Sequence, residues 1–285
     1  MQKIMIQLDT DQHASSFDSI TAIDAGADRL LSYSRVAPDQ VRSIVHGAMF
    51  TRGTESLKNT AIFVGGSNVS AAEQLLEVVQ DSFFGPVRVS VMLDANGCNT
   101  TASAVVVCLE KQITLSSATI VVMGSTGPVG RRVCKLLSLS GAKVIATSRS
   151  KESAEKLARG INDSLKNDSV RGVQANSPLD KANLLKDADG LVACGSAGVE
   201  LVDESTLRKS ERLQVAIDLN AVPPAGIGGV EAGNKAERVG HVYTYGAIGV
   251  GGLKMKTHRA AVESLFESND RVLKEEEIFE IAKRV

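Results

Sequence analysis

Short apolar runs alternate with longer amphipathic stretches along almost the whole chain. Runs of strand length lie at residues 3–8, 61–64, 87–92, 119–123, 143–147, 170–175, 190–193 and 215–218. Between them, apolar positions recur with the helical period at 16–25, 38–50 and 71–81, and in a helix that starts near Asn99 or Thr100 and continues through 102–110. Strands that alternate with helices are typical of parallel sheets built from βαβ units, so the pattern predicts an α/β fold.

The length of the chain indicates two domains, because 285 residues exceed the roughly 100–200 residues of a typical single domain. Helical periodicity returns near the end of the chain, at about 253–267 and 274–284. We therefore predict a smaller α/β substrate domain, residues 1–105, completed by the C-terminal helices of 253–285. Residues 106–252 are predicted to form a Rossmann-type domain with a parallel sheet.

The composition is that of a soluble globular protein, with 43% hydrophobic and 23% charged residues and a mean hydropathy of +0.02. A net charge of -1 disfavours a nucleic-acid partner, which usually selects a basic surface. The first apolar stretch is too short and too polar for a signal peptide or a membrane span, so we expect a cytoplasmic protein with no membrane partner. The four cysteines, Cys98, Cys108, Cys134 and Cys194, form no CxxC pair, and we expect them to be reduced, with no metal bound.

A glycine-rich loop follows the apolar run at 119–123 and precedes a helical pattern. Its sequence is Gly124-Ser125-Thr126-Gly127-Pro128-Val129-Gly130. In a dinucleotide-binding unit the first glycine permits the tight turn, the second lets the backbone approach a pyrophosphate, and the third allows close packing of helix and strand. The spacing GxxGxxG differs from the usual GxGxxG, and a merely structural turn is the alternative, but the strand–loop–helix–strand context favours a dinucleotide site.

The residues after the next predicted strand indicate which dinucleotide binds. An NAD enzyme places Asp or Glu there to bind the ribose hydroxyls, and this chain has Ser148, Arg149 and Lys151 instead. These residues suit the 2′-phosphate of NADP, a charge-assisted contact of roughly 1.5–3 kcal/mol. The alternative is a solvated charge pair at a helix start. We predict NADP as the cofactor, with NAD as a second possibility.

Two later loops are further candidates for cofactor contacts. Gly195 lies in the small-residue segment 193–198, which can pass beneath a nicotinamide ring because its residues let the ring approach the backbone. Asn220 lies in the loop 218–229 at the carboxyl end of a predicted strand, where open α/β sheets bind ligands. In both segments an ordinary structural turn is an equally good interpretation.

Two polar segments outside the glycine loop are candidates for substrate binding. In residues 93–101, Asn99 and Thr100 fit either N-capping or substrate contact, and Thr101 presents a hydroxyl from the first helical turn. In residues 251–259, a flexible glycine run opens a helix on which Lys254 and His258, four residues apart, share a face. Lys256 and Arg259 point elsewhere, and a basic surface helix is the alternative for the whole segment.

The motifs that carry a family resemblance are spread along the chain. They are Asp9-Thr10-Asp11, Thr51-Arg52-Gly53, Ala61-Ile62-Phe63-Val64-Gly65-Gly66, residues 93–101, Gly127-Pro128-Val129-Gly130 and residues 251–258. With these motifs the sequence resembles the bacterial NADP-dependent methylenetetrahydromethanopterin dehydrogenases over essentially its whole length. The resemblance implies a homotrimer in which each chain has a cofactor domain. It also implies a pterin cleft that is formed between the domains, with a neighbouring subunit as a further wall of the cleft.

The resemblance also implies roles for four residues. By matched motif, the family's active-site phenylalanine, threonine, lysine and histidine fall on Phe17, Thr101, Lys254 and His258. The implied reaction is hydride transfer from the methylene bridge of a tetrahydromethanopterin or tetrahydrofolate derivative to the nicotinamide. Phe17 would stack on an aromatic ring of the substrate, although a core position is an equal alternative for an aromatic residue at a helix start.

Four other functional classes compete with this interpretation. Short-chain dehydrogenases and bifunctional folate dehydrogenase–cyclohydrolases use a Tyr-x-x-x-Lys pair, and Tyr33, Tyr243 and Tyr245 are followed four residues later only by Ala or Gly. We therefore predict no cyclohydrolase activity. A non-catalytic NADP sensor, or another Rossmann oxidoreductase with a different small substrate, is the remaining alternative, and a sensor would not need the polar residues Thr101, Lys254 and His258.

Overall fold

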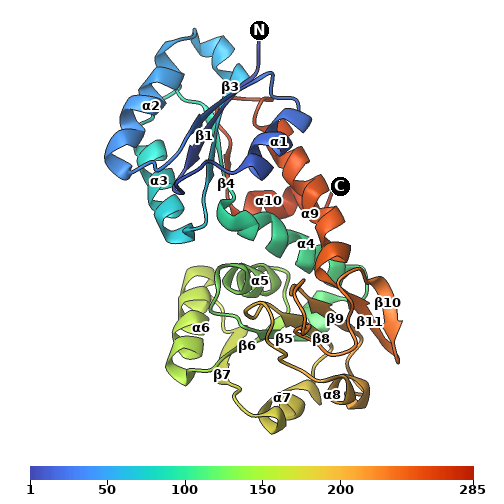
Figure 1. Cartoon of the computed structure of the whole chain (residues 1–285). Helices are drawn as coiled ribbons and strands as arrows, with labels where there is room; N and C mark the ends of the chain where they lie inside the picture. The colour runs from blue at the N-terminus through green and yellow to red at the C-terminus, as the bar shows by residue number, and fades with distance from the viewer. The chain divides into compact units, whose positions relative to one another are not determined.

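Two separate β-sheets organise the chain (Figure 1). The computed structural model describes residues 1–285, which divide by their contacts into two units. Unit 1 consists of Met1–Thr100 and Met255–Val285, and unit 2 consists of Thr101–Lys254. The chain passes from one unit to the other within two helices, α4 (Cys98–Glu110) and α9 (Ala247–Ser264).

The sheet of unit 1 has five parallel strands in the order β12-β4-β3-β1-β2. Its elements are β1 (Ile4–Asp9), α1 (Ser16–Asp24), β2 (Arg29–Tyr33), α2 (Pro38–Phe50), β3 (Thr60–Gly65), α3 (Val69–Asp81), β4 (Ser90–Leu93), β12 (Val272–Leu273) and α10 (Glu275–Ala282), with the C-terminal part of α9. Figure 1 shows α2 and α3 on one face of this sheet and α1, α9 and α10 on the other. The sheet is therefore covered on both faces.

Burial explains the apolar runs at the central strands of unit 1. Every residue of β3 and β4 is buried, because helices cover both faces of a parallel sheet. Met5, Phe63 and Met92 belong to one core cluster together with Val262 of α9 and Ile278 of α10. The C-terminal helices thus complete the core of unit 1.

The sheet of unit 2 has seven strands in the order β10-β11-β9-β8-β5-β6-β7. Its elements are β5 (Thr119–Met123), α5 (Pro128–Leu139), β6 (Lys143–Ser148), α6 (Lys151–Leu165), β7 (Val170–Gln174), α7 (Pro178–Leu185), β8 (Gly190–Ala193), α8 (Glu204–Lys209), β9 (Val215–Asp218), β10 (Lys235–Val239) and β11 (Val242–Tyr245). All neighbouring strands are parallel except β10, which pairs antiparallel with β11 at the edge. Counted from β5, the parallel strands have the order 3-2-1-4-5-6 of dinucleotide-binding sheets, and the order reverses between β5 and β8.

The predicted α/β class is confirmed, and the strands predicted at 119–123, 190–193 and 215–218 have the observed bounds. The sequence pattern misses β2, β10, β11 and β12. In β2 and β10 most side chains are exposed, and β12 has two residues, so these edge strands carry no continuous apolar signal.

The prediction of a flexible glycine run before Lys254 is wrong. Helix α9 begins at Ala247, so Gly249, Gly251 and Gly252 are helical. A Cβ atom on Gly249 would lie 1.8 Å from the carbonyl oxygen of Asn234. This glycine therefore serves a close approach of two backbone segments, not flexibility.

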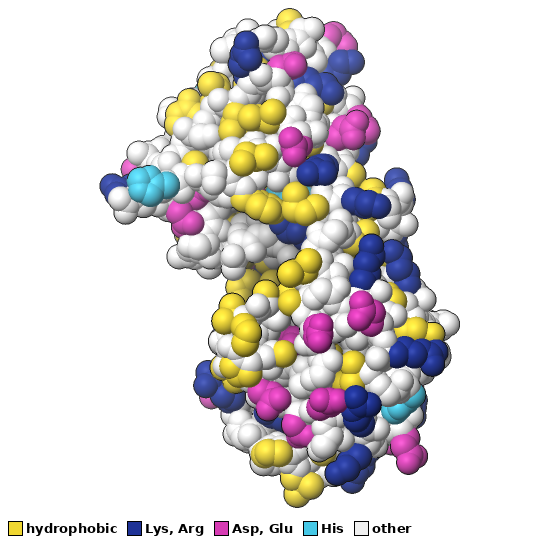
Figure 2. Space-filling view, turned by 45° about the vertical axis from the view of Figure 1, so that its right-hand side comes forward, with side chains coloured by type: hydrophobic (Ala, Val, Ile, Leu, Met, Phe, Trp, Pro, Cys, Tyr) yellow, Lys and Arg dark blue, Asp and Glu magenta, His cyan; other side chains and the backbone are white.

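No helix of the chain combines the length and the hydropathy that a membrane span requires. On the face drawn in Figure 2, acidic and basic side chains are interspersed, which agrees with the near-zero net charge.

Candidate active site

The loop between β5 and α5 depends on glycine at two of its three glycine positions. Gly124 has a φ of +70°, and a Cβ atom there would lie 2.8 Å from the carbonyl oxygen of Cys194 in the loop after β8. A Cβ atom on Gly130 would lie 2.6 Å from the carbonyl oxygen of Gly124. The two loops at the reversal of strand order therefore pack backbone to backbone.

The remaining glycine, Gly127, leaves room for a further atom at the start of α5. It is the N-cap residue, Pro128 is the first residue of the helix, and no side chain caps the first turn. The nearest atom to a Cβ on Gly127 would be the carbonyl oxygen of Gly124, at an ordinary contact distance of 3.6 Å. An uncapped helix N-terminus with such room beside it is a favourable place for an anion such as a pyrophosphate.

A pocket of about 400 Å³ opens at the carboxyl ends of the strands of unit 2. Six of the twelve residues that the sequence assigns to cofactor binding line it, namely Gly124, Thr126, Gly127, Ser148, Arg149 and Gly195. The structure thus brings the glycine loop together with residues at the carboxyl ends of β6 and β8.

The other six candidate residues lie outside the lining, namely Ser125, Pro128, Val129, Gly130, Lys151 and Asn220. Ser125 is buried, and its hydroxyl donates to the carbonyl oxygen of Thr147 at 2.9 Å, which ties the loop to β6. The ammonium group of Lys151 lies 3.8 Å from the carboxylate of Glu155, one turn further along α6.

Asn220 stabilises its own loop. Its side-chain amide donates to the carbonyl oxygen of Pro224 at 2.8 Å, and its side-chain oxygen accepts from the backbone N–H of Val222 at 2.9 Å. These contacts agree with the structural alternative for this segment.

Sequence reasoning missed three polar residues of the same pocket, Asn176, Lys181 and Glu200. Lys181 lies in the first turns of α7, and nothing in its local sequence distinguishes it from a solvated helix lysine. Only the pairing of β6 with β7 brings α7 to the residues after β6.

The cysteine at the pocket wall is not poised as a nucleophile. Burial raises the pKa of the Cys194 thiol to about 12, with a smaller contribution from the nearby carboxylate of Asp218. The thiol is therefore protonated at neutral pH and acts as a small apolar wall residue.

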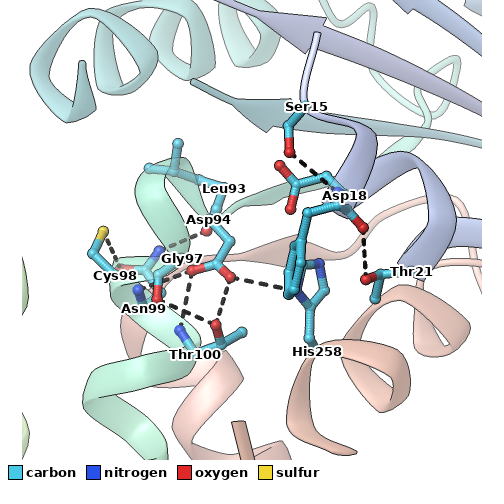
Figure 3. A network of polar contacts seen from close by, with 11 residues as sticks. Ser15, Asp18, Thr21, Leu93, Asp94, Gly97, Cys98, Asn99, Thr100 and His258 are labelled. Carbon is cyan, nitrogen blue, oxygen red and sulfur yellow. Dashed lines mark hydrogen bonds and ion pairs between the residues drawn. The ribbon is translucent and has the colours of Figure 1, made fainter. Parts of the chain in front are cut away.

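In unit 1, the imidazole of His258 is buried, and Figure 3 shows it next to the carboxylate of Asp94. Its ring stacks on that of Phe63, with the centroids 5.6 Å apart and the planes at 13°. Phe17 approaches in a tilted arrangement, with centroids 6.2 Å apart. Nδ1 of His258 lies 3.8 Å from Oδ2 of Asp94. The imidazole thus has an aromatic face and an acidic edge.

Asp94 holds the first turn of α4. Its Oδ1 accepts from the backbone N–H groups of Asn99 and Thr100, at 2.9 and 3.0 Å, and its Oδ2 accepts from the hydroxyl of Thr100 at 2.6 Å. The capping group is therefore Asp94, and of the two alternatives for Asn99 and Thr100 the N-capping one is wrong because α4 begins at Cys98. Asn99 instead donates its side-chain N–H to the carbonyl oxygen of Leu93 at 2.6 Å. Sequence reasoning included Asp94 in this segment but gave it no role.

Phe17, Thr101 and Lys254 all keep part of their surface exposed. Phe17 lies in the first turn of α1 with 47% of its surface exposed, so its ring is not a core side chain. Thr101 and Lys254 are partly exposed. The neighbours of Lys254 and His258 on α9 point elsewhere, since Lys256 is exposed and Arg259 lies 3.3 Å from Asp24.

These features define a class of fold, a chain of two α/β units in which one unit has the strand order of dinucleotide-binding sheets. Two solved structures share the fold along the whole chain. Quinate dehydrogenase from Corynebacterium glutamicum in complex with NAD is 14% identical, with complete coverage of both chains and a TM-score of 0.57. Shikimate 5-dehydrogenase from Listeria monocytogenes in complex with shikimate and NAD is also 14% identical, with 98% and 96% coverage and a TM-score of 0.53.

The sequence itself defines the family. Residues 16–96 match the family model described as methylene-tetrahydromethanopterin dehydrogenase, N-terminal. The "Bifunctional protein MdtA" of Methylorubrum extorquens is 39% identical over 286 residues, covering 100% of this chain and 99% of the relative. The NAD(P)-dependent methylenetetrahydromethanopterin dehydrogenase of the same organism is 29% identical, with 94% and 93% coverage. The chain belongs to the methylene-tetrahydromethanopterin dehydrogenase family, as the dispersed motifs predict.

Proposed function

We propose that the protein is an NADP-dependent dehydrogenase that oxidises methylene-tetrahydromethanopterin to its methenyl form in one-carbon metabolism. Methylene-tetrahydrofolate is the alternative substrate, because it shares the reacting centre. The observation that carries the proposal is the full-length match at 39% identity to a relative in this family. The pocket of unit 2, with its glycine loop and Arg149, supports it independently.

The pocket residues suit a phosphorylated dinucleotide. Gly127 leaves room for a pyrophosphate at the start of α5, and Ser148 and Arg149 line the same pocket at the end of β6, where the adenosine ribose of the dinucleotide would bind. A guanidinium group favours the 2′-phosphate of NADP, and residues 146–151 at the end of β6 include no Asp or Glu to bind the ribose hydroxyls of NAD. NAD remains a weaker alternative cofactor.

A bound NADP would supply the hydride acceptor. A C–H bond of the methylene bridge would break, its hydrogen and electron pair would pass to the nicotinamide as hydride, and the methenyl cation product would be stabilised by its two adjoining nitrogens. No proton has to be abstracted. The protein therefore has to orient the substrate and exclude water.

Four residues are proposed to orient the pterin substrate. The exposed ring of Phe17 offers a stacking surface, and Thr101 and Lys254 offer polar contacts. His258, held between Phe63 and Asp94, shapes the wall and the electrostatic field next to Phe17. From the family resemblance we also propose a homotrimeric assembly.

An absorbance assay of nicotinamide reduction tests the proposal. The purified protein is mixed with NADP and either methylene-tetrahydromethanopterin or methylene-tetrahydrofolate, with NAD in parallel. We expect reduction of NADP with at least one of the two pterins. Binding of NADP without turnover of either substrate would favour a non-catalytic sensor, and absence of both binding and turnover would refute the proposal.

Hydrolysis of the methenyl product needs its own assay, since one relative is named bifunctional. No tyrosine of this chain is followed by a lysine four residues later. We expect methenyl-pterin to hydrolyse at the background rate in the presence of the protein. Enzyme-dependent acceleration would contradict this expectation.

A further inference from the structure

The pocket of unit 2 contains two cationic side chains from different elements. Arg149 directly follows β6, and Lys181 lies in the first turns of α7. Lys151, the other cation near the end of β6, is paired with Glu155 outside the pocket. Neither Arg149 nor Lys181 has a carboxylate within ion-pair distance. Two positive charges that share a pocket and have no carboxylate within ion-pair distance favour an anionic ligand.

Backbone contacts hold the two elements side by side. Ser148, the last residue of β6, pairs with Gln174, the last residue of β7. Beyond this pair, the N–H of Ala175 donates to the carbonyl oxygen of Ser148 at 3.1 Å, and the side-chain amide of Gln174 donates to the carbonyl oxygen of Arg149 at 2.9 Å. The segment that leads into α7 is thus tied to the segment that carries Arg149.

The start of α7 is fixed by a capping box. The hydroxyl of Ser177 accepts from the N–H of Asp180 at 3.1 Å, and the carboxylate of Asp180 accepts from the N–H of Ser177 at 3.0 Å. Asp180 is not part of the pocket lining. Lys181, the next residue, is therefore held on a defined turn, and only its side chain remains adjustable.

The charges of the pocket are segregated. Its carboxylate, Glu200, belongs to the segment after β8, whereas Arg149 and Lys181 come from the side of β6 and β7. Strand β5 separates β8 from β6 in the sheet. An anion is thus favoured over the ends of β6 and β7, which is where sheets of this strand order place the adenosine ribose.

We propose that Lys181 binds the 2′-phosphate of NADP together with Arg149 and so contributes to the preference for NADP over NAD. The inference rests on the proposed function, because it assigns a residue to the dinucleotide site. NAD carries a hydroxyl group in place of this phosphate, so an ammonium group at Lys181 makes a charge-assisted contact only with NADP. Lys181 is thus a specificity-determining residue and takes no part in the chemical step.

Equilibrium binding of NADP and NAD, measured by calorimetry, tests this assignment. We expect Lys181→Ala and Lys181→Gln to weaken NADP binding about tenfold and to leave NAD binding unchanged, because one charge-assisted contact is lost at a half-exposed site. Lys181→Arg should retain most of the preference. Binding of adenosine 2′-monophosphate should weaken in parallel with that of NADP.

Lys186→Ala is the matched control. Lys186 is the C-cap residue of the same helix, is exposed, and donates to the side chain of Asn183 at 2.9 Å, outside the pocket. We expect no change in the binding of either dinucleotide. If the unaltered protein prefers NADP and both Lys181 variants keep that preference, the assignment of Lys181 is wrong and the proposed function stands. If the unaltered protein does not bind NADP, both are wrong.

Discussion

The buried carboxylate of Asp94 serves two elements of unit 1. It accepts hydrogen bonds from the first turn of α4, and it faces the imidazole of His258 on α9. A buried charge is tolerated when several donors surround it. Asp94 therefore links the position of Thr100, and with it that of the following Thr101, to the environment of His258.

Removal of the polar side chains of Lys254 or His258 on α9 should slow the reaction without weakening the binding of NADP. We expect Lys254→Ala and His258→Ala to lower kcat/KM roughly tenfold to a hundredfold, because a displaced substrate loses its reactive orientation. The dissociation constant of NADP should be unchanged. Steady-state kinetics and dinucleotide titration measure the two quantities.

Two comparisons keep this prediction specific. Lys256→Ala, on the exposed side of α9, should leave the kinetics unchanged. His258→Gln retains most of the side-chain volume, so a loss of kcat/KM in a variant with an unchanged thermal midpoint would reflect the imidazole and not unfolding. Unchanged kinetics in both Lys254→Ala and His258→Ala would remove these residues from the site.

The glycines at the start of helix α9 differ in what surrounds them. Gly246, just before the helix, and Gly249, in its first turn, pack against the backbone of residues 231–235. A Cβ atom on Gly252, by contrast, would meet nothing within 4 Å. The glycines of this segment thus have different physical roles although the sequence presents them as one run.

Alanine substitutions at two glycines of α9 should therefore have opposite effects. We expect Gly249→Ala to destabilise the protein by about 2 kcal/mol or more, because its Cβ would overlap the carbonyl oxygen of Asn234. Gly252→Ala should stabilise it by about 0.5–1 kcal/mol through helix propensity. Denaturant unfolding measures both changes, and equal effects would argue against the packing described for Gly249.

The surface of unit 1 bears on how whole molecules assemble. Several apolar side chains of unit 1 are exposed on α1 and on the edge strand β2, namely Phe17, Ile20, Ile23, Leu31 and Tyr33. An exposed edge strand with apolar neighbours is a common place for contacts between chains. It is compatible with the homotrimer proposed from the family resemblance.

Light scattering coupled to size-exclusion chromatography tests the assembly. We expect a mass of three chains, that is, three times 30.0 kDa. The measurement is repeated over a range of protein concentrations, because a weak assembly would dissociate on dilution. A monomer at all concentrations would contradict the trimer without affecting the dinucleotide site.

Local patterns in the sequence were sufficient to predict the α/β class, the central strands and the glycine loop. A buried parallel strand is an apolar run whatever its neighbours are, and Gly124 needs its positive φ because of the turn itself. The same local information predicted that Ser148 and Arg149 follow the strand next to the loop. The exposed edge strands β2 and β10 have no such signal and were missed.

Only the tertiary structure decided which polar residues share a site. Lys181 lies in the pocket with Arg149, whereas Lys151 and Asn220 lie outside its lining. The side chain that caps α4 is that of Asp94. The physical reason is that strand pairing and side-chain packing join residues that are far apart in the sequence. Hydrophobic periodicity reports whether a side chain is buried, but it carries no information about which partner the side chain meets.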